Sequence, residues 1–302
     1  MSGHIVVVGS LNMDLVVHTP RLPKLGETVL GNRFQTFPGG KGANQSVAAA
    51  RLGAQVKMIG CVGDDAFGDS LRNNLLQDGV DVALVRLISE APTGVALITV
   101  DEAGHNTIVV NPGANGCLKP ADILTGREAF DGAAALLAQL ECPFETVQQA
   151  VALARQQGMP VILNPAPAQV LEPAFFAQID YLIPNQIELS MLTRSDSVAV
   201  AVSRLHEWGV KNVIVTLGEE GVLISDDEGS TKLPAHQVPV IDTTAAGDAF
   251  VGAFAVAITQ GRNTLEAARW GNAAGALAVT RSGAQPSLPR AAEVQSLLAR
   301  AA

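Results

Sequence analysis

Short runs of apolar, mostly β-branched residues recur along the chain and alternate with stretches of helical spacing. Runs that are apolar on both faces are typical of strands in a parallel sheet that is covered on both sides. We predict strands of this kind at residues 5–8, 56–59, 135–137, 160–163, 181–183 and 213–216.

Helical patterns lie between these runs. Residues 67–75 carry apolar side chains four positions apart, and Gly79 follows as a stop signal. Near the end of the chain, residues 247–260 and 264–280 predict two more helices. Alternating strands and helices predict right-handed βαβ units. The expected fold is therefore α/β, with a doubly wound, mostly parallel central sheet and helices on both faces.

Two regions break this rhythm. Residues 11–38 are extended and punctuated by Pro and Gly, and residues 93–111 have the pattern of a hairpin. Together they are expected to form a small β lid that projects over a ligand, with exposed apolar positions that could pair with a second subunit. The alternative is an edge extension of the main sheet. The chain shows no internal repeat and no linker, so we expect residues 1–302 to form a single domain.

Composition narrows the function classes. The chain has 302 residues, of which 20 are basic and 29 acidic, for a net charge of −9. This balance argues against a nucleic-acid-binding protein, which needs a basic face, but not against a bound anion. Cys61, Cys117 and Cys142 are odd in number and widely spaced, which favours reduced thiols. No apolar run approaches the roughly 20 residues of a membrane span. We therefore expect a soluble, cytoplasmic protein with no nucleic-acid or membrane partner.

The segment 242–248, Asp-Thr-Thr-Ala-Ala-Gly-Asp, leads directly into an apolar helical stretch. Ala245, Ala246 and Gly247 place backbone N–H groups at the start of a helix, where the helix dipole favours a bound anion. Asp248 would hold a carboxylate over that anion. This arrangement suits phosphoryl transfer with the carboxylate as catalytic base. The alternative is that an Asp here is only a helix N-cap.

Two segments near the N-terminus carry groups that could bind hydroxyls. Residues 37–45 are glycine-rich, which allows close approach to a ligand, and Lys41 and Asn44 supply donors. The alternative for this segment is a plain connection between a strand and a helix. Asn12 and Asp14 follow the first strand and are two residues apart, so in an extended chain they point the same way. Their alternative is an Asx turn.

Two later segments also follow predicted strands. Asn185 and Glu188 are three residues apart at an expected helix start. They could orient water around Mg²⁺ or form a capping box, and the spacing favours neither. Residues 216–221 contain glycines that could lie along the phosphates and ribose of a nucleotide, and the alternative is a hairpin turn. The sequence has no His-Glu-x-x-His, Gly-x-Ser-x-Gly or dinucleotide-binding motif.

With these motifs in this order, the chain resembles the ribokinase-like (PfkB-type) carbohydrate kinases from residue 6 to about residue 289. Residues 39–44 and 242–248 carry the resemblance, with Asn185 and Glu188 between them. It implies a central sheet with helices on both faces and a β lid that also clasps a second copy in a homodimer. It also implies a reaction in which ATP phosphorylates the primary hydroxyl of a sugar.

The resemblance also implies roles for individual residues. Asp248 would be the base, and the anion hole would be formed by Ala245, Ala246 and Gly247. The sugar would be held by Asn12, Asp14, Gly40, Lys41, Gly42, Asn44, Glu141 and Asp248. The residues that contact ATP would be Asn185, Thr216, Gly218, Gly221, Gly247 and Asn272, and Glu188 would support Mg²⁺ through water. An activating K⁺ would be bound, partly through backbone carbonyls, by Asp242, Thr244, Ala278, Arg281, Gly283 and Ser287.

One position departs from the family pattern, which usually reads Gly-Ala-Gly-Asp. Ala245 replaces the first Gly. Because Ala lacks the freedom of Gly at positive φ, the replacement is tolerable if this residue adopts an ordinary φ, and the exact geometry of the anion hole depends on that φ.

The resemblance favours D-ribose as the acceptor and ribose 5-phosphate as the product. Relatives share the hydroxyl-binding residues, so 2-deoxyribose, fructose or a nucleoside remain alternative acceptors. A third possibility is a non-catalytic sugar or nucleotide sensor on the same fold.

Overall fold

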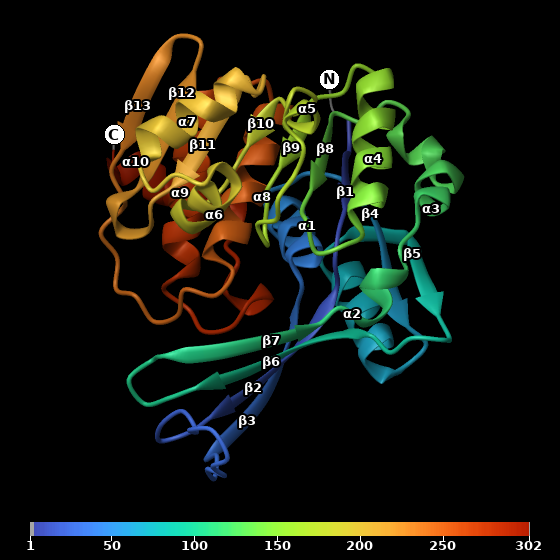
Figure 1. Ribbon diagram of the computed structural model, residues 1–302, viewed down its shortest axis with the longest axis vertical. Coiled ribbons are helices and arrows are strands. Elements are labelled where there is room, and N and C mark those ends of the chain that lie inside the picture. Colours follow the sequence, from blue (N-terminus) through green and yellow to red (C-terminus); the bar gives the residue numbers. More distant parts are fainter. Residues whose placement is uncertain (1–2, 302) are drawn as a thin grey trace.

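The computed structural model describes residues 3–301, and its centre is a nine-stranded sheet (Figure 1). Neighbouring strands are parallel except at one edge, where a hairpin pairs antiparallel with its neighbour. From edge to edge the strands are β13 (Gly229–Leu233), β12 (Val222–Asp226), β11 (Asn212–Thr216), β10 (Tyr181–Leu182), β9 (Val161–Leu163), β8 (Ala135–Ala138), β1 (Ile5–Val8), β4 (Val56–Gly63) and β5 (Val80–Ile88).

The strand order reverses next to β1. The chain runs from β1 outward to β4 and β5, and then returns to β8 on the other side of β1. In open α/β sheets, ligands bind in the crevice beyond the carboxyl ends of the strands at such a switch point. The fold therefore directs attention to the loops that follow β1 and β8.

Both faces of the sheet are buried. Ile5 and Val7 of β1 belong to one apolar core, and Val6 and Val8 belong to the other, as the two-residue period of a strand requires. The first core is covered by α1 (Lys41–Arg51), α2 (Ala66–Gln77), α8 (Ala246–Thr259), α9 (Thr264–Ala278) and α10 (Ala291–Ala301). The second is covered by α3 (Pro120–Thr125), α4 (Phe144–Gln156), α5 (Pro173–Phe176), α6 (Gln186–Thr193) and α7 (Val198–Glu207). The predicted doubly wound α/β fold is thereby confirmed.

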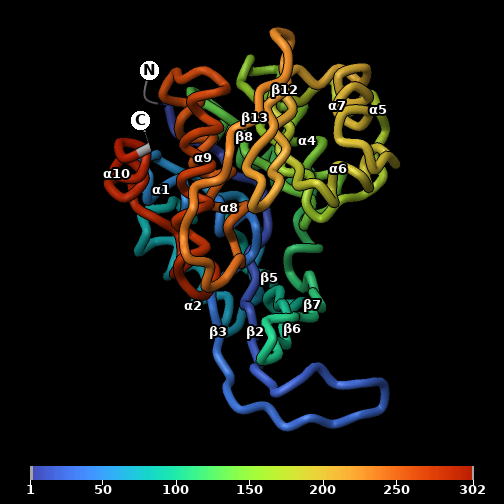
Figure 2. Tube along the Cα trace, turned by 90° about the vertical axis from the view of Figure 1, so that its left-hand side faces the viewer, coloured from blue at the N-terminus to red at the C-terminus, as the bar shows by residue number. Residues whose placement is uncertain are grey.

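A separate four-stranded sheet projects from the main body (Figures 1 and 2). Its strands, in spatial order, are β3 (Arg33–Gly39), β2 (Asn12–His18), β6 (Gly94–Val100) and β7 (Asn106–Asn111). The predicted hairpin at 93–111 is present as antiparallel β6 and β7. The small sheet is thus independent of the main sheet, and the edge-extension alternative is wrong. In Figure 2 the loop between β2 and β3 forms its far end.

The strand β5 was not anticipated from the sequence. Its residues alternate between buried and exposed positions, as in Val80, Asp81 and Val82, because β5 lies at the edge of the sheet. Within residues 3–301, no helix has both the length and the apolar character needed to cross a membrane.

Candidate active site

Asp248 lies in the first turn of α8, where this helix packs against α1. Gly252, one turn further on, permits the close approach, because a Cβ there would lie 2.6 Å from the Cβ of Ala48 in α1. One turn before Ala48, the Nδ2 group of Asn44 donates a hydrogen bond of 2.8 Å to Oδ2 of Asp248. Both side chains are buried. The glycine-rich segment 37–45 and the segment 242–248 therefore meet in one contact.

Gln45 also contacts Asp248, although its position in the sequence predicts no role for it. Its Nε2 group donates a hydrogen bond of 2.9 Å to Oδ1 of Asp248. Each carboxylate oxygen of Asp248 thus accepts one amide hydrogen bond from α1. The one available signal was that Gln45 directly follows Asn44 in the glycine-rich segment.

The N-terminus of α8 has an unusual first residue. Ala245 is the N-cap and has φ 59° and ψ 9°, which is left-handed, so the condition of an ordinary φ is not met. This conformation costs an L-residue about 1–2 kcal/mol. The N–H of Ala246 donates to the carbonyl of Thr243 at 3.3 Å, whereas those of Ala245 and Gly247 have no acceptor among residues 3–301. Two of the three expected anion-hole donors are therefore free.

Lys41, the first residue of α1, is partly buried among four carboxylates. Burial by itself lowers the pKa of its ammonium group. The negative charges of Asp248, Glu141, Glu188 and Asp14 together outweigh burial, so that the pKa of Lys41 is raised. Lys41 is therefore a permanent cation within this acidic group.

Glu141 connects the switch point to α1. It follows β8, and its Oε2 accepts hydrogen bonds from the hydroxyl of Ser10, which follows β1, and from the backbone N–H of Lys41 at 3.1 Å. The carboxylate thus interacts with the positive end of the α1 dipole. Gly40, the N-cap of α1, has φ 86°, and a Cβ there would lie 2.6 Å from the backbone nitrogen of Asn12. Only glycine fits this turn.

Asn12 and Asp14 both lie in β2 and are buried. The Oδ1 atom of Asn12 accepts a hydrogen bond of 2.8 Å from Asn115. Burial raises the pKa of Asp14 to about 7, and the negative charges of Glu141 and Asp248 contribute to the shift. Asp14 therefore changes its charge near neutral pH.

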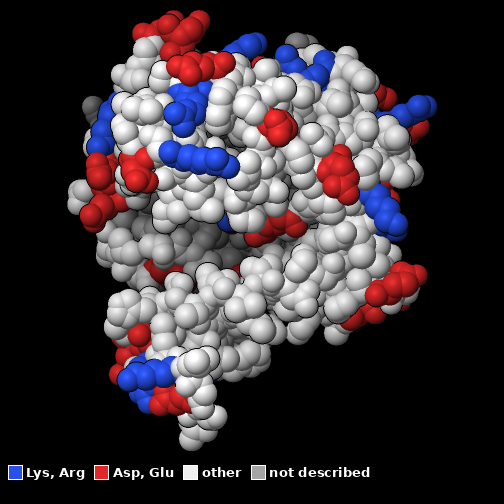
Figure 3. All heavy atoms as spheres, in the orientation of Figure 1, with Lys and Arg blue, Asp and Glu red and all other residues white. Residues whose placement is uncertain are grey.

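A cavity of about 210 Å³ opens at the N-terminus of α8. It is bordered by Asp248, by the free N–H groups of Ala245 and Gly247 and by the carboxyl ends of neighbouring strands. In an open α/β sheet, a ligand is expected at this end of the strands. Its lining residues are Lys41, Asn164, Ile183, Asn185, Glu188, Thr216, Thr243, Ala245, Gly247, Asp248 and Val251. Three residues expected to contact a nucleotide do not line it, namely Gly218, Gly221 and Asn272. Figure 3 shows the molecule hollowed between the main body and the small sheet, with acidic side chains at the border of the hollow.

Asn185 and Glu188 form a capping box at the start of α6. The Oδ1 of Asn185 accepts from the N–H of Glu188, and Oε2 of Glu188 accepts from the N–H of Asn185, each at 2.8 Å. Burial raises the pKa of Glu188, against the opposing effects of this N–H and of Lys41. Glu188 also lines the cavity, so the capping role and a role toward a bound group are compatible. Within residues 3–301, no three His, Cys, Asp or Glu side chains converge on a metal-sized site.

The segment 216–221 is the turn of the hairpin formed by β11 and β12, which was the alternative interpretation. Thr216 pairs with Asn185 in an isolated parallel bridge, which holds the segment beside the start of α6. Gly221 has φ 96°, and a Cβ there would lie 2.0 Å from the carbonyl oxygen of Leu233. Asn272 in α9 donates a hydrogen bond of 2.8 Å to the carbonyl of Pro234 and so lies beside the chain that follows β13.

Asp242 joins the two segments expected to bind a monovalent cation. Its Oδ1 accepts from the N–H of Thr244 at 2.9 Å and its Oδ2 from the N–H of Gly283 at 2.8 Å. Burial raises the pKa of Asp242, but these N–H groups outweigh it and the net shift is downward. Asp242 is therefore an ionised oxygen donor between the two loops, as a cation site requires.

The side chains of Arg281 and Ser287 are engaged elsewhere. Arg281 forms an ion pair with Glu293, and the hydroxyl of Ser287 donates to the carbonyl of Ala284 at 2.7 Å. These two residues could therefore serve a cation through their backbone carbonyls, and Ser287 also through its hydroxyl lone pairs.

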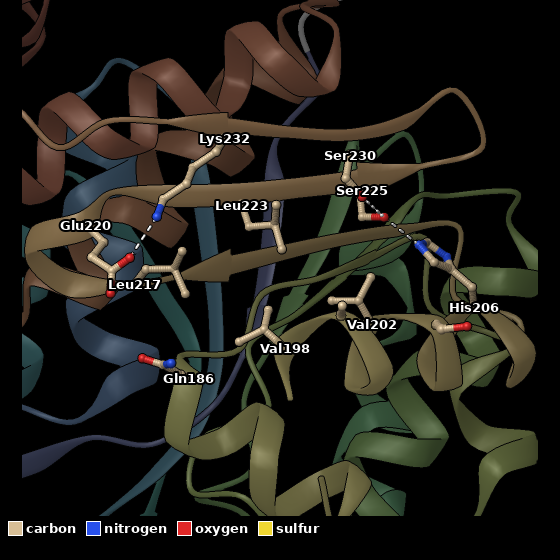
Figure 4. Close-up of a pocket in the computed structure, with 12 residues that line it drawn as sticks. Gln186, Val198, Val202, His206, Leu217, Glu220, Leu223, Ser225, Ser230 and Lys232 are labelled. Carbon is tan, nitrogen blue, oxygen red and sulfur yellow. Dashed lines mark hydrogen bonds and ion pairs between the residues drawn. The ribbon is translucent and has the colours of Figure 1, made fainter. Parts of the chain in front are cut away.

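A larger cavity, of about 590 Å³, lies between α7 and the hairpin of β12 and β13 (Figure 4). Val198 and Val202 form part of its apolar wall. At one end of the cavity, Lys232 and Glu220 form an ion pair of 2.7 Å. At the other end, the imidazole of His206 is hydrogen-bonded to the hydroxyl of Ser225. None of the individually predicted site residues lines this cavity, although Leu217 and Glu220 of the segment 216–221 do.

Comparison with known proteins relates this geometry to a chemistry. The pfkB family carbohydrate kinase model matches residues 2–291. A ribokinase from Haemophilus influenzae is 40% identical, over 98% of this chain and 99% of its own. A deoxyribokinase from Salmonella typhi is 38% identical, over 94% of this chain and 95% of its own. The solved structure of Arabidopsis thaliana ribokinase complexed with ribose and ATP aligns with a TM-score of 0.92 at 35% identity and covers 99% of both chains.

Proposed function

The chain belongs to the pfkB family of carbohydrate kinases, and we propose that it transfers the terminal phosphoryl group of ATP to the primary hydroxyl of D-ribose. The observation that carries the proposal is the position of Asp248. Its carboxylate is held by two amides beside the free N–H groups of the α8 N-terminus and beside Lys41. A base and an anion site are thus adjacent, as phosphoryl transfer requires.

In the proposed reaction, the hydroxyl oxygen of the sugar attacks the terminal phosphorus while its proton passes to the carboxylate of Asp248. The bond from phosphorus to the bridging oxygen breaks, and ADP leaves with the electron pair. The N–H groups of Ala245 and Gly247 are placed to stabilise charge on the phosphoryl oxygens. The ammonium group of Lys41 adds positive charge on the sugar side.

We propose that the sugar lies between the small sheet and α1. Buried acceptors are available there on Asp14 and on Asn44, whose Oδ1 has no partner among residues 3–301. Because Asn44 donates its Nδ2 group to Asp248, it would serve the sugar mainly as an acceptor rather than as the expected donor. The proposed contacts are Asn12, Asp14, Gly40, Lys41, Gly42, Asn44, Glu141 and Asp248.

We propose that the nucleotide extends from the cavity along the hairpin turn after β11. Its phosphates would lie at Gly247 and Asn185, and its nucleoside along Thr216, Gly218 and Gly221 toward Asn272. Glu188 would hold Mg²⁺ through water, because it lines the cavity and uses only one of its carboxylate oxygens in the capping box. Bound there with the phosphates, Mg²⁺ would neutralise their charge.

The two loops joined by Asp242 are the proposed site of an activating K⁺. Support comes from the ionised carboxylate and from the contact of Asp242 with Gly283, which brings both loops together. The proposed ligands are Asp242, Thr244, Ala278, Arg281, Gly283 and Ser287.

The small sheet is proposed to act as a lid over the sugar and as the contact of a homodimer. Asp14 and Leu15 are adjacent in β2, so they point to opposite faces of this sheet. Leu97 lies opposite Leu15 in register, Val109 lies opposite Leu97, and these two residues are 51% and 64% exposed. An apolar face of this kind, on the side away from Asp14, fits the same face of a second copy. We also propose a cytoplasmic setting, which agrees with the free thiols of the three cysteines.

A second candidate acceptor is 2-deoxyribose, because one curated relative is a deoxyribokinase. The test compares kcat/KM for D-ribose, 2-deoxy-D-ribose, D-fructose and adenosine under the same ATP concentration. The proposal expects D-ribose to have the highest value and the product to carry phosphate on its primary carbon. A higher value for 2-deoxyribose would overturn the choice of sugar, and no ADP formation with any of them would overturn the kinase function.

A further inference from the structure

A chain of three buried amide side chains leads from the core to Asp248. Gln139 donates from Nε2 to Oε1 of Gln45 at 2.6 Å. The Nε2 group of Gln45 donates to Oδ1 of Asn164 at 3.1 Å as well as to Asp248. Asn164 in turn donates from Nδ2 to the backbone carbonyl of Ile183 at 2.8 Å. Gln45 and Gln139 are fully buried, and Asn164 is 8% exposed.

The backbone carbonyl of Ile183 sets the direction of this chain. A carbonyl oxygen only accepts, so Asn164 must turn its Nδ2 group toward it and its Oδ1 toward Gln45. Gln45 must then present Nε2, because a flipped amide would point Oε1 at two acceptors, Asn164 and Asp248. The Nε2 group of Gln139 satisfies the remaining Oε1 atom of Gln45. Asp248 consequently faces a donor whose orientation is fixed.

We propose that Gln45 is a positioning residue for phosphoryl transfer, which holds the carboxylate of Asp248 in its working orientation and is itself oriented by Asn164 and Gln139. The inference rests on the proposed function, in which Asp248 is the base. With Asn44 on Oδ2 and Gln45 on Oδ1, rotation of the carboxylate breaks a hydrogen bond in a buried setting, which is costly.

Charged neighbours make this restraint necessary. Asp14 in β2, Lys41 in α1 and Glu188 in α6 all act electrostatically on Asp248. An unrestrained carboxylate would turn toward the ammonium group of Lys41 and away from the two acids. Such an ion pair would compete with the acceptance of a proton from the sugar hydroxyl. The two amide donors of α1 keep Asp248 in place without neutralising it.

The test begins with Gln45→Met, which keeps the approximate volume of the side chain and removes the donor. We expect kcat to fall about 10- to 100-fold, because a charged group loses one hydrogen bond, while KM for ATP stays within about twofold. The acidic limb of the kcat–pH profile should move to higher pH, because the charged form of the carboxylate loses a hydrogen-bond donor. Thr146→Val removes another fully buried hydrogen bond, from its hydroxyl to the carbonyl of Leu118, and should change neither kcat nor the profile.

Asn164→Leu provides a second route and serves if Gln45→Met does not fold. It leaves the Gln45 amide free to flip, so we expect a smaller fall in kcat than for Gln45→Met. The double variant should have about the kcat of Gln45→Met alone, since Asn164 acts through Gln45. The inference would be overturned if the kcat of Gln45→Met lay within about twofold of the wild-type value. It would also be overturned if the kcat–pH profile did not move and the losses in kcat of the two single variants were additive. Absence of turnover in the wild type would instead reject the proposed function.

Discussion

Asn44 donates a hydrogen bond of 2.8 Å to Asp248 across 204 positions of sequence. The contact exists because Gly252 lets α8 lie directly on α1. It unites a segment that could bind a sugar with a segment that could bind a phosphoryl group. The site is therefore a product of helix packing, and its geometry can be tested by changes in either helix.

Ala245 is expected to carry strain that glycine would relieve. Because its φ is 59°, Ala245→Gly removes a Cβ from an unfavourable conformation and should raise the free energy of unfolding by about 1 kcal/mol. The measurement is urea unfolding at constant pH. Ala152→Gly, in the middle of α4, is the control and should lower the free energy of unfolding by about 1 kcal/mol. Equal losses in both variants would contradict the left-handed conformation.

Asp14 should make stability fall as the pH rises. The pKa of Asp14 is about 7 in the folded protein, against an ordinary value of 3.8 in the unfolded chain. At a pH between these two values, the folded state therefore binds more protons than the unfolded state. The free energy of unfolding therefore decreases from about pH 4 to pH 7. Asp14→Asn removes this loss and should be more stable than the wild type at pH 8 by on the order of 2 kcal/mol. Unfolding measured across this pH range gives the comparison.

Asp65 is a control for Asp14, because replacing it by Asn should change the stability in the opposite direction. Burial raises the pKa of Asp65, but hydrogen bonds from Thr93 and from the N–H of Gly68 outweigh it and lower the pKa overall. Its contribution to stability is present above the ordinary pKa and is lost in acid. Asp65→Asn should thus be less stable than the wild type at pH 7, with the difference shrinking below about pH 4. The same sign for both variants would refute the burial argument for Asp14.

Asp242 is expected to control activation by a monovalent cation. The wild type should turn over about tenfold faster in K⁺ than in tetramethylammonium at equal ionic strength. Asp242→Asn should bring this ratio close to one, because the ionised donor between the two loops is lost. Asp227→Asn, a surface acid, should keep the wild-type ratio. A ratio near ten in Asp242→Asn would show that the cation acts elsewhere.

Leu97 is expected to lie in a dimer contact. A charge there would be buried without a partner, so Leu97→Lys should convert the dimer to a monomer in light scattering at micromolar concentration. Leu124→Lys in α3 is matched, because Leu124 is 52% exposed against 51% for Leu97, and it should remain dimeric. A dimeric Leu97→Lys variant or a monomeric wild type would contradict the proposed interface.

The sequence predicts much of the fold, because buried parallel strands carry runs that are apolar on both faces. The edge strand β5 was not predicted, because one of its faces is exposed and its buried and exposed residues alternate. A capping box was one of the two interpretations of Asn185 and Glu188, because it depends only on residues three apart. Residue spacing therefore predicts those interactions that join residues close to each other in the sequence.

Other parts of the site depend on packing and could not be predicted. Gln45 bonds to residues 94, 119 and 203 positions away, and no spacing rule relates them. The left-handed φ of Ala245 was likewise hidden, because the residue type argues against it and only the fixed junction before α8 imposes it. Tertiary context overrode local preference at the point where the proposed chemistry occurs.

The most direct test of the account is the single-turnover rate of Asp248→Asn with D-ribose and ATP. The variant keeps the shape of the side chain but cannot accept the proton, so we expect the rate to fall about 10²- to 10⁴-fold. The dissociation constants of both ligands, measured by calorimetry, should stay within about threefold. Asp69→Asn, an acid in the first turn of α2, should keep the wild-type rate. A near-normal rate in Asp248→Asn would show that Asp248 is not the base.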